Sequence, residues 1–222
     1  MGSNSTGASN TAIGKAVMFA NTTGSDNTAV GFEALAANTT GYRNTAVGAY
    51  AGDAITTGDQ NTYMGYVAGS SHTDANNNTG IGYGALYSNT TANNNTAVGA
   101  QALEANTTGT QNVAVGANAL DANTTASNNI AVGYEALTAN TTGGENVAIG
   151  RRALHVATTG DRNIGIGQGA LESHTTASDN VAVGNGSMAY NTTGTQNTAM
   201  GSGALISNTT GSQLTAVDAN AL

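Results

Sequence analysis

The chain has 222 residues with 31 Gly and no Pro, Cys or Trp, and only 8% of its residues are charged. The formal net charge is −8 and Lys and Arg together number five, which excludes a basic patch for binding DNA, RNA or anionic lipid. Without Cys there is no disulfide or thiolate metal site, and no apolar run approaches the roughly 20 residues of a transmembrane helix, so we expect no membrane contact by this chain.

One unit of 17 residues recurs along the chain without insertion or deletion. Complete copies begin at Asn10 and every 17 residues up to Asn197, with partial copies at both ends, so we interpret residues 1–222 as a single repeat array. The consensus is Asn-Thr-Ala-Val-Gly-x-x-Ala-Leu-x-Ala-Asn-Thr-Thr-Gly-x-x, numbered here as positions 1 to 17. Helical repeats need roughly 33 to 47 residues per unit, whereas a β-solenoid coil needs only short strands and turns. The predicted fold is therefore all-β, a parallel β-solenoid or β-roll of about thirteen 17-residue coils.

A short strand is expected over positions 1 to 5 of every copy, for example at residues 112–116. Positions 2 and 4 are rich in Thr, Val and Ile and share one face, whereas position 3 between them is Ala or Gly in all copies but one. We expect the bulky face to fill a thin core and the small face to let a neighbouring sheet or chain approach closely. Tyr63 is the exception at position 3 and marks a local irregularity.

The middle of each copy predicts a bend followed by a second buried segment. Gly at position 5, from Gly14 to Gly201, indicates a place where a side chain would clash or φ is positive. Ala at position 8 and Leu at position 9 are expected to be buried. Gly52 and Gly69 replace this Leu in the third and fourth copies, which should thin the core and weaken those coils.

The remaining positions predict turns and ladders. Asn-Thr-Thr-Gly at positions 12 to 15 is typical of turns. When coils stack at about 4.7 to 4.9 Å, identical residues superpose and Asn amides can form hydrogen-bonded ladders. We expect one structural ladder of Thr at position 13, including Thr22, Thr107 and Thr209. A second is expected of Asn at position 1, namely Asn10, Asn27, Asn44, Asn61, Asn78, Asn95, Asn112, Asn129, Asn146, Asn163, Asn180 and Asn197.

The units Asn112-Val-Ala-Val-Gly-x-x-Ala119 and Asn146-Val-Ala-Ile-Gly-x-x-Ala153 resemble the head repeat of YadA-type trimeric autotransporter adhesins, Asn-Ser-Val-Ala-Ile-Gly-x-x-Ser/Ala. The longer form is similar to repeats of phage tail fibres and large bacterial surface proteins. The resemblance covers essentially the whole chain and implies a left-handed, trimeric β-roll displayed on a cell surface or virion tail. The 17-residue period departs from the shorter period of classical heads, and no neck, stalk or anchor is recognised within residues 1–222.

Few residues are candidates for chemistry. His72 and His174 replace Asn at position 12 but lie six coils apart, too far to share a metal ion. Near-identity between copies leaves no unique catalytic constellation, so we predict no enzymatic activity, no cofactor and no metal site. Glu104 and Asp121 at position 10 of adjacent copies are better explained by a solvated face than by a cation site.

Aromatic residues recur at position 6, among them Tyr66, Tyr83 and Tyr134. Exposed rings can stack on sugars, so these three are candidate contacts for a host-surface glycan, with packing between chains as the alternative interpretation.

We interpret the chain as a segment of an extracellular structural fibre, an adhesin or tail fibre, that gives length and rigidity and has itself as partner in a homotrimer. Two alternatives remain open. Subunits could polymerise head to tail into a filament through uncapped coil ends, because such contacts do not close. The second alternative is an ice-binding solenoid, which would need two outward Thr columns. Adjacent Thr at positions 13 and 14 would point to opposite sides of an extended segment, so only one column would face outward.

Overall fold

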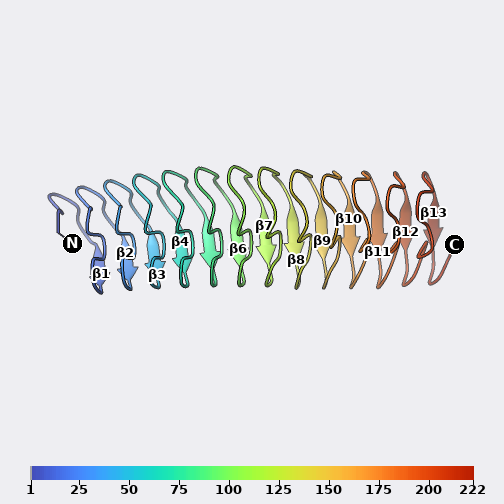
Figure 1. Ribbon diagram of the computed structural model, residues 1–222, viewed down its shortest axis with the longest axis horizontal. Helices are drawn as coiled ribbons and strands as arrows, with labels where there is room; N and C mark the ends of the chain where they lie inside the picture. Colours follow the sequence, from blue (N-terminus) through green and yellow to red (C-terminus); the bar gives the residue numbers. More distant parts are fainter. Residues whose placement is uncertain (1) are drawn as a thin grey trace. The chain divides into compact units, whose positions relative to one another are not determined.

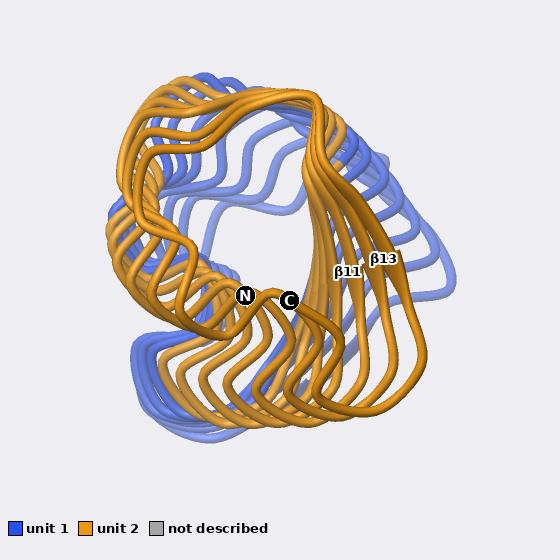
Figure 2. Ribbon diagram, turned by 90° about the vertical axis from the view of Figure 1, so that its right-hand side faces the viewer, with its two compact units in different colours: residues 1–111 blue, residues 112–222 orange. Residues whose placement is uncertain are grey.

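The computed structural model describes residues 2–222, and the chain divides into two compact units, unit 1 up to Gln111 and unit 2 from Asn112 (Figure 2). Each unit is a parallel β-solenoid with one short strand in every coil (Figure 1), which confirms the predicted fold class. Left-handedness and a trimer stay predictions. No helix within residues 2–222 is long and apolar enough to cross a membrane.

The strands have three residues each and occupy positions 2 to 4 of their coils, within the predicted positions 1 to 5. Within residues 2–111, unit 1 holds β1 (Thr11–Ile13), β2 (Thr28–Val30), β3 (Thr45–Val47), β4 (Thr62–Met64), β5 (Thr79–Ile81) and β6 (Thr96–Val98). Unit 2 holds β7 (Val113–Val115), β8 (Ile130–Val132), β9 (Val147–Ile149), β10 (Ile164–Ile166), β11 (Val181–Val183), β12 (Thr198–Met200) and β13 (Thr215–Val217). Neighbouring strands of a unit pair in parallel with equivalent residues opposite each other, as in Thr11 with Thr28 and Val113 with Ile130.

The strands face the opposite way from the expectation drawn from the sequence. The small residue at position 3 points inward and is fully buried, as at Ala29 and Ala148. The larger side chains at positions 2 and 4 point outward, and Ile149 and Met200 are 38% and 47% exposed. The predicted arrangement of a bulky core face and a small outer face is therefore wrong, because the interior of a 17-residue coil is already occupied by residues from its other segments.

Those other segments supply one large apolar side chain, a small one and two amides. In the coil of β8, the buried side chains are those of Ala131 on the strand, Ala136 and Leu137 at positions 8 and 9, and Asn129 and Asn140 at positions 1 and 12. Leu at position 9 is thus in the core, as predicted. Buried amides are costly unless they are hydrogen-bonded, and the ladders described below satisfy that requirement.

Left-handed backbone conformations recur at positions 7, 9 and 17 of the coils, mostly in residues other than Gly. Examples are Glu135, Leu137 and Glu145, with φ of 53°, 54° and 60°. Such a conformation costs roughly 1 to 2 kcal/mol per residue, but it turns the N–H along the stack. The N–H of Glu135 donates to Ala117 in the preceding coil (3.0 Å), and that of Leu137 to Ala153 in the next (2.9 Å). Backbone hydrogen bonding between coils therefore extends well beyond the strands.

Gly at position 5 is required for two reasons. Its φ is positive, for example 146° at Gly31 and 130° at Gly150. A Cβ on Gly116 would also lie 2.4 Å from the carbonyl oxygen of Gly133 in the next coil. Both reasons for the predicted bend at this position are confirmed.

The coils that contain Gly52 and Gly69 are filled rather than thinned. Tyr63 turns inward from position 3 of β4 and is fully buried. A Cβ on Gly69 would lie 2.4 Å from its ring, and one on Gly80 in the next strand 2.9 Å away. The tyrosine hydroxyl hydrogen-bonds Nδ1 of His72. The expected thinning of the core is wrong, because Tyr63 occupies the volume that Leu occupies in other coils.

Candidate functional site

The Asn column at position 1 forms a ladder inside each unit. The backbone N–H of Asn146 donates to Oδ1 of Asn129 (2.9 Å), and Nδ2 of Asn146 donates to the carbonyl of Gly160 in its own coil (2.8 Å). Asn27 makes the same two bonds in unit 1. Every Asn of this column from Asn27 to Asn197 is buried. Each side chain thus closes its own coil with its amide and binds the next coil with its oxygen.

A second Asn column, at position 12, was not among the predicted ladders. Nδ2 of Asn38 donates to Oδ1 of Asn21 and to the carbonyl of Gly41, both at 3.0 Å. The column is interrupted, because Ile55 follows Asn38 and leaves its Oδ1 without a partner. The signal available in the sequence was the recurrence of Asn at both positions. It was missed at position 12 because turn residues are not usually expected inside a core.

The Thr column at position 13 has its hydroxyls engaged. Oγ1 of Thr22 donates to the carbonyl of Thr39 (2.9 Å), and Thr209 accepts the same bond from Thr192 (3.0 Å). The carbonyl of Thr107 accepts a longer one from Thr90 (3.3 Å). The column at position 14 is exposed throughout, whereas that at position 13 is half-buried except at Thr73 and Thr209.

Tyr66 and Tyr83 lie side by side on neighbouring coils of unit 1. Their ring centroids are 5.9 Å apart and their planes are inclined at 12°. The row continues on the two preceding coils, with 6.1 Å between the centroids of Tyr66 and Tyr50 and 5.2 Å between those of Tyr50 and Phe32. Tyr66 and Tyr83 are each more than half exposed. Tyr134 belongs to unit 2 and is 48% exposed, with no aromatic ring contact among residues 112–222.

A hollow of about 370 Å³ lies beside this row. Its lining consists of Tyr66, Val67, Tyr83, Gly84, Tyr87 and Glu104. The hollow is open at Gly84 because glycine has no side chain at position 7, where the next coil carries Gln101. Nε2 of Gln101 donates to the Glu104 carboxylate (2.7 Å). Aromatic surface and a hydrogen-bond acceptor thus meet at the edge of one open space.

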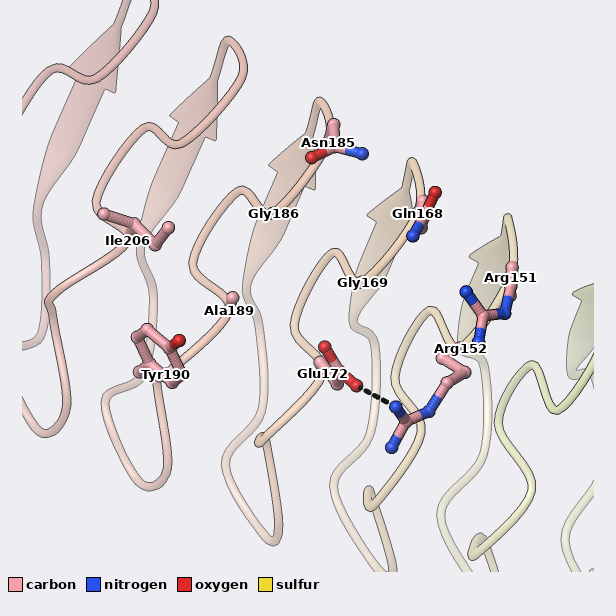
Figure 3. Close-up of a pocket in the computed structure, with 10 residues that line it drawn as sticks. All are labelled: Arg151, Arg152, Gln168, Gly169, Glu172, Asn185, Gly186, Ala189, Tyr190 and Ile206. Atoms are coloured by element: carbon pink, nitrogen blue, oxygen red, sulfur yellow. Dashed lines mark ion pairs between the residues drawn. The ribbon is translucent and has the colours of Figure 1, made fainter.

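Unit 2 carries a second hollow, of about 250 Å³, which sequence reasoning missed (Figure 3). Figure 3 shows Arg151, Gln168 and Asn185 in one row, from position 6 of three successive coils. The facing row and the floor are Arg152, Glu172, Ala189, Tyr190, Ile206, Gly169 and Gly186. The available signal was Gly at position 7 beside a polar residue at position 6.

The two buried histidines, His72 and His174, make hydrogen bonds inside the fold. No group of three or more His, Cys, Asp or Glu residues that could hold a metal ion occurs in the described part of the chain, residues 2–222. Burial lowers the pKa of His72 to about 4 and also lowers that of His174. Nε2 of His174 lies 2.7 Å from the carbonyl of Ala177, where Asn places its amide in other coils.

Comparison of the chain with protein-family models, curated proteins and solved structures returned no match.

Proposed function

We propose that the chain is a structural segment of an extracellular fibre, an adhesin or tail fibre, that assembles as a homotrimer through its strand faces. The observation that carries this proposal is the outward face of unit 2. Both outward residues of every strand from β7 to β11 are Val or Ile. Ile130, Ile149 and Ile166 are each more than a third exposed, so this is a continuous aliphatic surface without charge.

A second copy of the chain is the partner that fits this face. Its strands carry the same columns at the same coil spacing, so apolar side chains would meet along the whole contact. Burial contributes roughly 25 cal/mol per Å² of apolar surface removed from water. The resemblance to trimeric adhesin repeats supports three chains, and the coil-to-coil hydrogen bonds support a rigid spacer.

Solution mass and electron microscopy test the assembly. The intact chain is expected to have the mass of three chains and to form discrete rods. Ile149→Lys with Ile166→Lys places two charges on the outward face and should give monomers with unchanged circular dichroism. The matched control is Thr159→Lys with Thr176→Lys, on the same two coils at exposed position 14. A monomeric wild-type chain would contradict the proposal, and filaments of unlimited mass would favour head-to-tail assembly.

Glycan adhesion is a second proposed function, supported by the tyrosine row and its hollow on unit 1. Tyr83→Ala should abolish binding to the neutral glycans of an array, because Tyr83 belongs to both the row and the hollow. Tyr42→Ala is the control, since Tyr42 is exposed but belongs to neither. Neutral-glycan binding that survives Tyr83→Ala would remove the row from any adhesive role.

A further inference from the structure

We infer that the hollow on unit 2 binds a sugar that carries a carboxylate, and that Arg151 is the cation that recognises it. This inference does not depend on the oligomeric state proposed above. It combines an unpaired cation, two free amides, an exposed aromatic ring and an open floor, all from the same few coils (Figure 3).

Arg151 is unusual among the five cationic residues of this acidic chain. Within residues 2–222 it is the one Lys or Arg with neither an ion pair nor an aromatic ring contact. The others are Lys15 over Phe32, Arg43 over Tyr42, Arg152 with Glu172 and Arg162 with Asp179. Arg151 is therefore free to accept a carboxylate from outside the chain.

Gln168 and Asn185 extend the same edge of the hollow. Both are exposed, and within residues 2–222 the one side chain that bonds either residue, that of Ser202, donates to the backbone carbonyl of Asn185 and leaves both amides free. They follow Arg151 on the next two coils, so three polar groups are spread over about 10 Å at the usual strand spacing. This spacing suits a mono- or disaccharide, whose hydroxyls can bind the amides while its carboxylate binds the guanidinium.

The facing edge offers complementary contacts. Tyr190 is 59% exposed and lies near Ile206, which together give an apolar surface for the C–H face of a sugar ring. Glu172 is held by Nη1 of Arg152 at 3.0 Å and can accept hydroxyl hydrogen bonds. Gly169 and Gly186 place no side chain between the two edges, which keeps the hollow open.

The hydrogen bonding of the backbone favours a sugar over a peptide. Peptides that lie along a β-structure are bound through free main-chain groups. Here the N–H of Gly169 already donates to Arg151 (3.0 Å) and that of Gly186 to Gln168 (2.9 Å). Recognition therefore depends on side chains. A polyanion is also a poor fit, because Glu172 neutralises Arg152 and leaves a single cation.

A titration of the whole chain followed by NMR tests the inference. The probes are the methyl glycosides of glucuronic acid and N-acetylneuraminic acid, with methyl glucoside as the neutral counterpart of the first. At least one acidic sugar should bind in the millimolar range and shift the resonances of Arg151 and Tyr190. Binding should be about tenfold tighter than for methyl glucoside, the usual scale of a hydrogen bond to a charged group. Arg151→Gln should remove this tenfold preference.

Two further variants separate the hollow from general charge effects. Gly186→Gln should abolish binding by filling the hollow, and the backbone tolerates it, because Gln101 occupies position 7 with φ of 57° where Gly186 has 62°. Thermal unfolding checks that this variant is folded. Arg162→Gln removes the same charge elsewhere and should leave binding unchanged. Equal binding of acidic and neutral sugars, binding unaffected by Arg151→Gln, or no binding of either acidic sugar would each overturn the inference.

Discussion

The two buried asparagines of each coil differ in what depends on them. At position 1, Oδ1 accepts a backbone N–H from the next coil, as Asn146 does from Asn163 (2.9 Å). At position 12, Oδ1 accepts only a side-chain amide from the next coil, as Asn123 does from Asn140 (3.0 Å), and it has no partner where the next coil lacks Asn, as at Asn140. This contrast explains why position 1 is Asn in every complete copy while position 12 admits Ile, His and Ala.

Asn146→Ala should therefore destabilise the fold more than Asn140→Ala. The first change leaves the N–H of Asn163 and the carbonyl of Gly160 buried without this partner, at about 1 to 3 kcal/mol each. The second removes the bond to Oδ1 of Asn123 and should cost about 1 kcal/mol, because the carbonyl of Gly143 still accepts from Asn129. Denaturant unfolding followed by circular dichroism measures both, and equal losses would contradict the distinct roles of the two columns.

The buried histidines predict a loss of stability in acid. Burial lowers the pKa of His72 to about 4, so between its ordinary pKa of about 6.5 and 4 only the unfolded chain binds the proton. Stability is thus complete above pH 6.5 and falls toward pH 4, by about 3 kcal/mol for this group. The pKa of His174 is lowered for the same reason. His174→Asn restores the usual position 12 residue and should flatten the decline of melting temperature with falling pH; parallel curves would refute this.

At the scale of the coil, the repeat period predicted the strands, the bend at position 5 and the buried Leu. Three features could not be predicted. Bulky apolar residues are usually buried, but many also lie on protein surfaces. Val and Ile at positions 2 and 4 therefore gave no sign that they face outward. Leu137 adopts a left-handed φ of 54° that no intrinsic preference favours. Tyr63 was visible as an exception, but its fit to Gly52 and Gly69 needed the fold.

Because position 3 faces inward and position 4 faces outward, adjacent strand residues should differ in how well they tolerate substitution. Ala148→Val adds two methyl groups to a filled interior and should destabilise the coil by about 1 to 3 kcal/mol, although Val favours strands more than Ala does. Ile149→Thr, next to it on the outward face, should change the unfolding of a single chain by less than about 0.5 kcal/mol. Thermal unfolding at low protein concentration, where single chains dominate, compares them. A stabilising Ala148→Val would show that the interior has unfilled space.

For the molecule as a whole, each coil contacts mainly its neighbours within its unit, as in other solenoids. Deletion of residues 129–145 removes one whole coil from unit 2 and should leave the secondary structure intact with a modest loss of stability. Deletion of residues 129–144 leaves one residue extra, which shifts Asn, Ala and Leu out of their columns. The second variant should unfold or lose most of its stability. Circular dichroism and melting temperature distinguish the two, and similar behaviour would show that register is not fixed by the buried ladders.

The constant register of the ladders also bears on how such a chain can change over generations. Neighbouring coils present nearly the same buried residues, so unequal recombination between the nearly repeated stretches of its gene would gain or lose whole coils. Each product would keep every Asn, Thr and Gly column in register. Copy number can then drift without passing through a misfolded intermediate, while the outward positions, which no ladder constrains, remain free to acquire new surface chemistry.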